Sequence, residues 1–242
     1  MPLLLPLAPS SDTVPFGLPN PFSATFADWL SLPEDHGAEF LNGQIDYKTF
    51  PTLDHGRVQR RLARIVDPYD AKLRGDGSPG GWWIGSEVDV IINGQGVRPD
   101  MVGWRRDHFP KKPTKGPNGA IEARPDWVAE ILSESNQARD LKIKFDVYQA
   151  ALIPHYWILD PIGRVLLIHH RQPKRYIYVD GGGVKETLHA QPFDGLHLNV
   201  GFLFPDDEDD EEDNTSRIGT EEPLPPVLAQ GVPSSPDCGL SR

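Results

Sequence analysis

Three short segments of the sequence carry charged residues of types that act together in catalysis. The first contains Asp100, directly after a proline, the second contains Glu130 in an apolar run, and the third is a basic segment with Lys142 and Lys144. Asp100 and Glu130 each fall inside or at the edge of a β-like stretch, where a buried carboxylate is costly unless it binds something. Two strand-borne carboxylates with a nearby lysine are the groups that metal-assisted phosphodiester hydrolysis requires.

These residues need a sheet and a helix to bring them together. Hydrophobic periodicity predicts helices over residues 25–32, 54–73 and 138–151, the last with a start at 133–136. Strands are predicted over 82–92, 97–104, 126–132, 156–159 and 165–169, with a turn at Gly94–Gly96. Hairpins are predicted around Asn42-Gly43 and around Gly181–Gly183. This order predicts an α/β (α+β) domain with three layers, a mixed β-sheet flanked by helices.

Composition narrows the class of protein. A chain of 242 residues with 38% hydrophobic and 9% aromatic residues is long enough for one domain with a sizeable core. The single cysteine, Cys238, excludes a disulfide framework and fits a reducing compartment. No apolar run approaches the ~18–20 residues that cross a bilayer, and the proline-broken N-terminus is a poor signal peptide. We therefore expect a cytoplasmic protein with no membrane partner.

The charge is distributed unevenly along the chain. The formal net charge is −11, but residues 206–242 hold eleven acidic residues and two arginines, a net −9 that leaves −2 for residues 1–205. Like charges repel, so we expect residues 205–242 to form a disordered acidic tail, which serves solubility or competes with nucleic acid for a basic groove. Residues 1–23 are rich in proline and are expected to be flexible. The folded domain is predicted over residues 24–204.

Several motifs in their order along residues 25–170 resemble the Uma-type (Uma-two) endonuclease family of the restriction-endonuclease-like PD-(D/E)XK superfamily. The matching segments are Glu39-Phe-Leu-Asn-Gly43, His55 at the start of an arginine-bearing helix, Glu87-Val-Asp-Val90, Arg98-Pro-Asp100, Glu130-Ile-Leu-Ser133, Asp140 through Lys144 to Tyr148, and Tyr156-Trp-Ile-Leu-Asp160. Each segment alone is weak evidence, whereas their joint order and spacing are fairly specific to the family. The resemblance implies a restriction-endonuclease-like core.

The resemblance also implies a metal site. In the superfamily, the aspartate of the Pro-Asp pair, the glutamate of the next strand and a backbone carbonyl hold a divalent metal, which here implies Asp100, Glu130 and the carbonyl of Ile131. Glu87 is a candidate third carboxylate, or an ordinary exposed strand residue. Oxygen ligands suit Mg²⁺ or Mn²⁺. Glu39 and His55 are candidate accessory residues, although a histidine at a helix start is also a common cap.

The catalytic lysine departs from the superfamily pattern. The superfamily lysine follows the glutamate by two residues, where this chain has Leu132. The resemblance places it instead on the next helix, as Lys144, with Lys142 as the alternative. Both positions lie near the edge of the predicted apolar face of that helix, from which a long side chain can reach a site.

Two functions follow from these residues. The first is a Mg²⁺-dependent (or Mn²⁺-dependent) endonuclease that hydrolyses DNA phosphodiester bonds as a homodimer, one site for each strand. The second is a catalytically inactive nuclease fold that binds nucleic acid or protein, suggested by the missing lysine at position 132 and by the acidic net charge. Binding of Mg²⁺ or Mn²⁺ that depends on Asp100 distinguishes the two.

Overall fold

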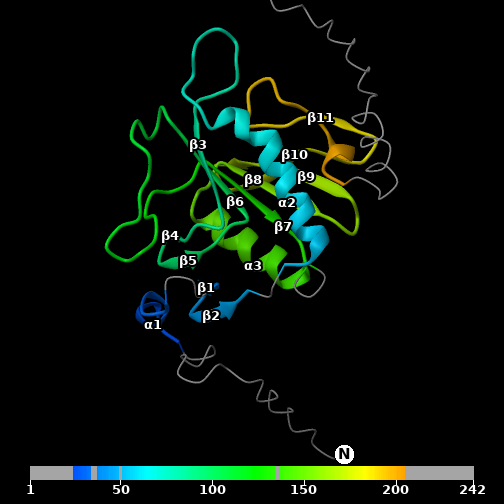
Figure 1. Cartoon of the computed structure of the whole chain (residues 1–242). Coiled ribbons are helices and arrows are strands. Elements are labelled where there is room, and N and C mark those ends of the chain that lie inside the picture. Colours follow the sequence, from blue (N-terminus) through cyan, green and yellow to red (C-terminus); the bar gives the residue numbers. More distant parts are fainter. Residues whose placement is uncertain (1–23, 34–36, 49–50, 134–136, 205–242) are drawn as a thin grey trace, which may run out of the picture. The chain divides into compact units, whose positions relative to one another are not determined.

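The computed structural model describes residues 24–33, 37–48, 51–133 and 137–204 (Figure 1). The predictions for residues 1–23, for a helix start within 134–136 and for the tail at 205–242 lie outside the described residues. The proposed domain boundaries therefore stay predictions.

The described chain contains three α-helices and two short 3-10 helices among its strands. The α-helices are α1 (Phe26–Leu30), α2 (Leu53–Val66) and α3 (Gln137–Ala150), and the 3-10 helices are η1 (Asp67–Tyr69) and η2 (Val200–Phe202). The strands are β1 (Ala38–Leu41), β2 (Gln44–Tyr47), β3 (Trp82–Ser86), β4 (Val90–Ile92), β5 (Gln95–Val97), β6 (Met101–Arg105), β7 (Trp127–Ile131), β8 (His155–Asp160), β9 (Val165–Gln172), β10 (Arg175–Gly183), β11 (Thr187–His189) and β12 (His197–Asn199).

The central sheet has six strands in the order β10-β9-β8-β7-β6-β3. Strands β7 and β8 are parallel and are joined through α3, while the other neighbours are antiparallel. Parallel neighbours need a crossover connection, which α3 provides. A second sheet in the order β2-β1-β5-β4 and a β11–β12 pair complete the fold. The central sheet is therefore mixed, as predicted.

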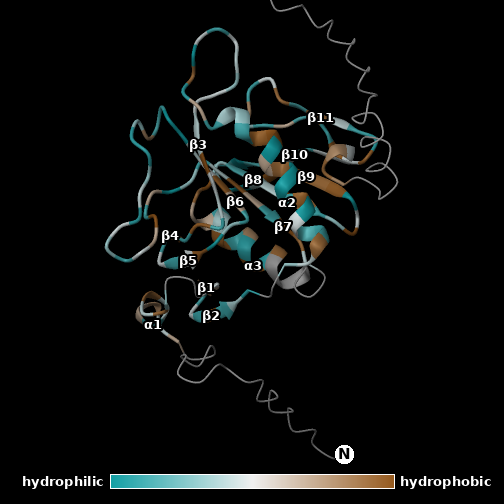
Figure 2. Cartoon of the chain, viewed as in Figure 1, coloured by the Kyte–Doolittle hydropathy of each residue, from teal (hydrophilic) through white to brown (hydrophobic). Residues whose placement is uncertain are grey.

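Helices α2 and α3 cover opposite faces of the central sheet. The apolar side of α2 packs with Trp127 and Trp157 in one core cluster, and α2 alternates between hydrophobic and hydrophilic residues along its length (Figure 2). The buried side of α3 packs with Val128 and Tyr156 in a separate cluster. Because successive strand residues face opposite sides, β7 contributes to both cores. The predicted three-layer α+β fold is confirmed.

Helix α2 is shorter than the predicted 54–73. It begins at its N-cap Thr52, whose hydroxyl accepts a hydrogen bond from the backbone N–H of His55 at 3.2 Å. It ends at Val66, and Pro68 lies in η1. Proline lacks the N–H that would continue the α-helical ladder, so the chain tightens into a 3-10 turn there.

Both long strands predicted before residue 105 are interrupted. The predicted strand 82–92 divides into β3 and β4 at Glu87, whose φ is 53°. The predicted strand 97–104 starts late, since β6 begins at Met101 and Val97 belongs to β5. The chain turns close to the predicted Gly94–Gly96, but the turn is Asn93-Gly94 and Gly96 lies in β5. Both interruptions lie at or beside residues that the sequence predicts as metal ligands, Glu87 and Asp100.

The two predicted hairpins differ in outcome. The Asn42-Gly43 hairpin is confirmed as β1–β2, with Leu41 opposite Gln44. The hairpin around Gly181–Gly183 is wrong, because these glycines pair with β9 inside β10, and the chain turns at residues 173–174 instead. A run of three glycines is typical of a turn, but in the fold these residues are extended and pair with β9.

The first hairpin is held against the rest of the domain by α1. Thr25 caps α1 in a reciprocal capping box with Asp28. The indole of Trp29 donates to the carbonyl of Ala38 at 2.9 Å and lies flat against Gly96 of β5. A Cβ at position 96 would lie 2.5 Å from that ring, so only glycine fits there. None of the helices in the described ranges is long and apolar enough to span a bilayer.

Candidate active site

The Arg98–Asp100 segment between β5 and β6 is fixed by three partners. The backbone N–H of Arg98 donates to Oε1 of Glu39 at 2.7 Å. Its guanidinium donates to both oxygens of Asp89, at 2.8 and 2.7 Å, and its carbonyl accepts from Nζ of Lys48 at 2.6 Å. Bidentate charge-assisted bonds of this kind define geometry closely. They hold the backbone that presents Asp100.

Asp100 lies at the entry of β6, beside the end of β7. Its Oδ2 accepts the backbone N–H of Ile131 at 2.7 Å. Its Oδ1 lies 3.3 Å from Nζ of Lys48 and 3.6 Å from Nε2 of His55. Burial alone would raise the pKa of Asp100, but Lys48, His55 and Lys144 together hold that pKa well below its usual range. Asp100 is thus a buried, ionised carboxylate.

Glu130 projects from β7 toward α3 and is buried with two partners. Its Oε2 accepts from Nζ of Lys144 at 2.9 Å, and its Oε1 accepts from the hydroxyl of Tyr148. Burial, together with the nearby negative charge of Asp100, raises the pKa of Glu130 to about 7, although the positive charge of Lys144 acts to lower it. Both oxygens of Glu130 are therefore held from the α3 side of the site.

Lys144 bridges two glutamates in the interior. Its Nζ also lies 3.1 Å from Oε2 of Glu39, and its side chain is only 5% exposed. Burial would lower the pKa of Lys144, but Glu130, Glu39 and Asp100 raise it well above its usual value. A lysine enclosed in this way stays charged and fixes the two carboxylates relative to each other.

Glu87 lies at the break between β3 and β4, and its carboxylate contacts other residues of the site. Its positive φ is rare for a residue with a side chain, and such strain gathers at functional positions. One oxygen, Oε2, lies 3.5 Å from Nζ of Lys48, and Oε1 accepts from Nε2 of Gln59 at 3.0 Å. The same Gln59 amide donates to the carbonyl of Asp100 at 3.1 Å. Burial, and to a smaller extent Asp100, raises the pKa of Glu87 although Lys48 lowers it.

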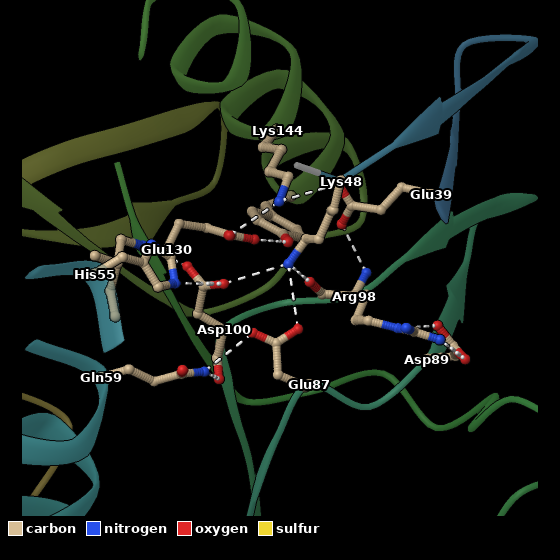
Figure 3. A network of polar contacts seen from close by, with 12 residues as sticks. Glu39, Lys48, His55, Gln59, Glu87, Asp89, Arg98, Asp100, Glu130 and Lys144 are labelled. Carbon is tan, nitrogen blue, oxygen red and sulfur yellow. Dashed lines mark hydrogen bonds and ion pairs between the residues drawn. The ribbon is translucent and has the colours of Figure 1, made fainter. Parts of the chain in front are cut away.

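The structure brings most of the predicted site residues to one place (Figure 3). These are Glu39, His55, Glu87, Asp100, Glu130 and Lys144. Lys142 is not among them, because its side chain is 81% exposed and pairs with Asp146 on the same helix at 3.2 Å. Ile131 contributes its N–H to Asp100, and the metal-binding role of its carbonyl stays a prediction.

Two residues of the site, Lys48 and Gln59, are not predicted from the sequence. Lys48 follows the first hairpin and contacts Asp100, Glu87 and the Arg98 carbonyl. Gln59 extends from α2, and Tyr148 of α3 belongs to a family segment but has no predicted role in the site. The local sequence around Lys48 does not indicate a role in the site, since its contacts depend on where the hairpin packs against the rest of the domain.

The site has the charge and the donors for a divalent cation. Ligand atoms of His55, Glu87 and Asp100 lie within 4.8 Å of one another. The carboxylates of Glu39, Glu87, Asp100 and Glu130 outnumber the ammonium groups of Lys48 and Lys144 by two negative charges when all are ionised. Carboxylate oxygens are the donors that Mg²⁺ and Mn²⁺ prefer, and the imidazole adds a nitrogen to the all-oxygen set that the resemblance implies.

Comparison with known proteins gives a family and a fold. A model of the Uma2 family, described as "Putative restriction endonuclease", matches residues 24–201. The crystal structure of a "putative nuclease belonging to DUF820" from Anabaena variabilis superposes with a TM-score of 0.58 at 20% identity, covering 75% of this chain and 97% of that one. A search of curated proteins finds no match. Because the family model matches well over half of the sequence, the resemblance is confirmed and this chain belongs to the Uma2 family of restriction-endonuclease-like nucleases.

Proposed function

We propose that this protein is a Mg²⁺- or Mn²⁺-dependent endonuclease that hydrolyses phosphodiester bonds in DNA. The observation that carries the proposal is the excess of carboxylates around Asp100, with the donors of His55 and Glu87 within 4.8 Å. Family membership supports nuclease chemistry, and the site supplies the charge that such chemistry needs.

Asp100 is the central metal ligand in this proposal. Glu87 and His55 offer ligand atoms within 4.8 Å of those of Asp100, and Glu130 is close enough for its charge to interact with that of Asp100. Both oxygens of Glu130 already accept a hydrogen bond, but a carboxylate oxygen has a second lone pair that can still ligate a cation. When bound, the metal would lower the pKa of a water and offset charge that develops on the phosphate.

The two lysines have different environments and so different proposed roles. Lys144 is enclosed by Glu39 and Glu130, which makes it a positioning residue that holds Glu130. Lys48 is 24% exposed, against 5% for Lys144, and its ammonium touches the site from the side of the first hairpin. Lys48 is therefore better placed to contact the phosphate of a bound strand. We assign it the charge role of the superfamily lysine that Leu132 replaces.

The proposal extends to assembly and substrate. A dimer would let one site serve each strand of a duplex, so we propose that the active form is a homodimer. The predicted alternative, an inactive nuclease fold that only binds, becomes the conclusion if the metal fails to bind.

Binding of Mn²⁺ and cleavage of supercoiled plasmid test the proposal together. We expect Asp100→Asn to lose Mn²⁺ binding in calorimetry and to lower nicking on the order of 10²–10³-fold. Asp146→Asn is the matched control, since Asp146 is an exposed carboxylate paired with Lys142. Wild-type protein that binds no Mn²⁺ and cuts neither plasmid nor single-stranded DNA overturns the nuclease function.

A further inference from the structure

A cavity of about 610 Å³ opens at the edge of the central sheet, between β3 and the loop after β6. Strand β3 is the last strand of that sheet, so its outer side carries no neighbouring strand of it. The lining residues come from β3, β6 and the loop, together with Asp70 and Val88. Volumes of roughly 300–1,000 Å³ are typical of small-molecule sites.

Two anchored indoles form the walls of this cavity. Nε1 of Trp83 donates to the carbonyl of Phe109 at 3.0 Å, and Nε1 of Trp104 donates to the carbonyl of Ala123 at 2.9 Å. The guanidinium of Arg106 lies 3.3 Å from the centroid of the Trp83 ring and is itself held by the carbonyl of Trp82. Trp104 is buried, whereas the Arg106–Trp83 pair forms a flat, anchored surface of the kind on which nucleobases stack.

The rim of the cavity is positively charged. Arg106, Lys112 and Lys115 line it, and the one carboxylate among the lining residues is Asp70, which lies 3.5 Å from Arg106. An apolar interior with a cationic rim is complementary to a ligand that joins a flat aromatic group to an anion.

The cavity adjoins the candidate active site. Gly85 and Val88 line it, and Glu87 lies between them in the sequence. Trp83 precedes Glu87 by four residues, or ~13 Å along an extended strand, which a few nucleotides of a bound strand can span. The cavity therefore begins directly beside Glu87 on this segment, within reach of nucleotides next to a phosphate bound at Glu87 and Asp100.

We propose that the cavity receives an unpaired nucleotide of the substrate strand, with its base against the Arg106–Trp83 stack and its phosphate near Lys112 and Lys115. This inference rests on the proposed function, because it names the form of DNA that the same site takes. A base can enter only when it is out of the duplex, and extruding a paired base costs a few kcal/mol. The protein therefore prefers single-stranded or locally unpaired DNA over a fully paired duplex.

Fluorescence anisotropy in EDTA tests this preference without cleavage. The probes are a fluorescein-labelled 12-nucleotide single strand of mixed sequence and its blunt duplex. We expect the wild-type protein to bind the single strand at least about tenfold more tightly, in line with the loss of one stacked base. Gly85 lines the cavity and a Cβ there meets only ordinary contacts of 3.7–3.8 Å with Val88 and Val102, so Gly85→Leu should narrow the cavity and abolish the preference.

Charge reversal at adjacent lysines gives a second measurement that does not disturb the core. Lys112 lines the cavity and Lys111 does not, although both are exposed. Lys112→Glu should weaken single-strand binding about tenfold, whereas Lys111→Glu should change it by less than about threefold. Equal effects of the two substitutions, or an unchanged preference in folded Gly85→Leu, overturn the inference.

Plasmid cleavage with Mn²⁺ separates this inference from the proposed function. A wild-type protein that shows the cavity-dependent preference but cleaves nothing loses the nuclease function and keeps the nucleotide site. A wild-type protein that cleaves, with the same strand preference in Gly85→Leu, loses the nucleotide site and keeps the nuclease function.

Discussion

The ammonium of Lys48 lies 3.3 Å from Oδ1 of Asp100, although 52 residues separate the two in the sequence. The same ammonium lies 3.5 Å from Oε2 of Glu87. These two carboxylates are also the oxygen donors of the group within 4.8 Å that could hold a metal. The Lys48 ammonium therefore lies beside the position that a divalent cation would take, and the two positive charges would repel each other.

This competition predicts opposite effects of Lys48→Met on stability and on metal response. Without metal, the variant leaves Asp100 and Glu87 less neutralised, which should cost about 1–3 kcal/mol of unfolding free energy. With Mn²⁺, the variant should gain more in melting temperature than the wild type, because a ligand that binds the folded state more tightly stabilises it more. Differential scanning calorimetry with and without Mn²⁺ measures both effects.

Cleavage by Lys48→Met should fall at least about tenfold despite the tighter metal binding, since the lysine is assigned to the substrate phosphate. Lys142→Met is the matched control, because its side chain is 81% exposed on α3. An equal rise in melting temperature with Mn²⁺ in Lys48→Met and in the wild type would contradict the competition.

Lys144 should matter for folding far more than Lys142 does. Lys144→Met leaves Glu39 and Glu130 buried without their shared cation, and removal of one partner from a buried ion pair costs about 3–5 kcal/mol. Lys142→Met removes an exposed pair with Asp146 and should change stability by less than about 0.5 kcal/mol. Urea unfolding of the two variants gives the comparison, and equal losses would refute the interior role of Lys144.

The sequence predicts the layers of this fold well because periodicity reports burial. The apolar run of β7 and the stripe of α3 are enough to place Glu130 and Lys144 on a strand and on the helix that follows it. The Asn42-Gly43 turn likewise specifies its hairpin locally. What periodicity cannot show is where that hairpin docks, so the approach of Lys48 to Asp100 has no local signal.

Breaks in the strands are the second feature that the sequence hides. Residues 82–92 have the composition of one strand, yet Glu87 adopts a left-handed backbone there and presents its carboxylate to Lys48. Such a conformation is maintained by tertiary contacts, here including the hydrogen bond from the Glu87 N–H to the carbonyl of Pro99. Local propensity predicts the regular continuation and misses the site geometry.

Glu87 and Glu130 can be separated as metal ligands by isosteric substitution. We expect Glu87→Gln and Glu130→Gln each to weaken Mn²⁺ binding about 10–100-fold in calorimetry. The effects on stability should differ, because the Glu87 side chain is 43% exposed while both oxygens of Glu130 are engaged inside the protein. A variant that binds Mn²⁺ like the wild type excludes its carboxylate from the ligand set. Asp146→Asn again serves as the control for a surface carboxylate.

Acid sensitivity of the fold should arise in part away from the active site, at His155 in β8. Burial, with smaller contributions from His170 and Arg105, lowers the pKa of His155 to about 3, and its ring stacks on that of His170 at 4.6 Å between centroids. The unfolded chain binds a proton at His155 below its ordinary pKa of about 6.5, whereas the folded chain does so only near pH 3. Between these values, acid favours the unfolded state.

His155 should therefore lower the unfolding free energy as the pH falls from about 6.5 toward 3, with a slope of up to about 1.4 kcal/mol per pH unit, while the raised pKa of Glu130 gives a contribution of opposite sign between about pH 7 and 4.5. His155→Gln removes this proton uptake and should flatten the slope in that window, although burial also lowers the pKa of His169 and leaves part of it. Urea unfolding at pH 7, 6, 5 and 4 measures the slopes. Parallel pH curves for His155→Gln and the wild type would show that His155 becomes protonated within the folded protein.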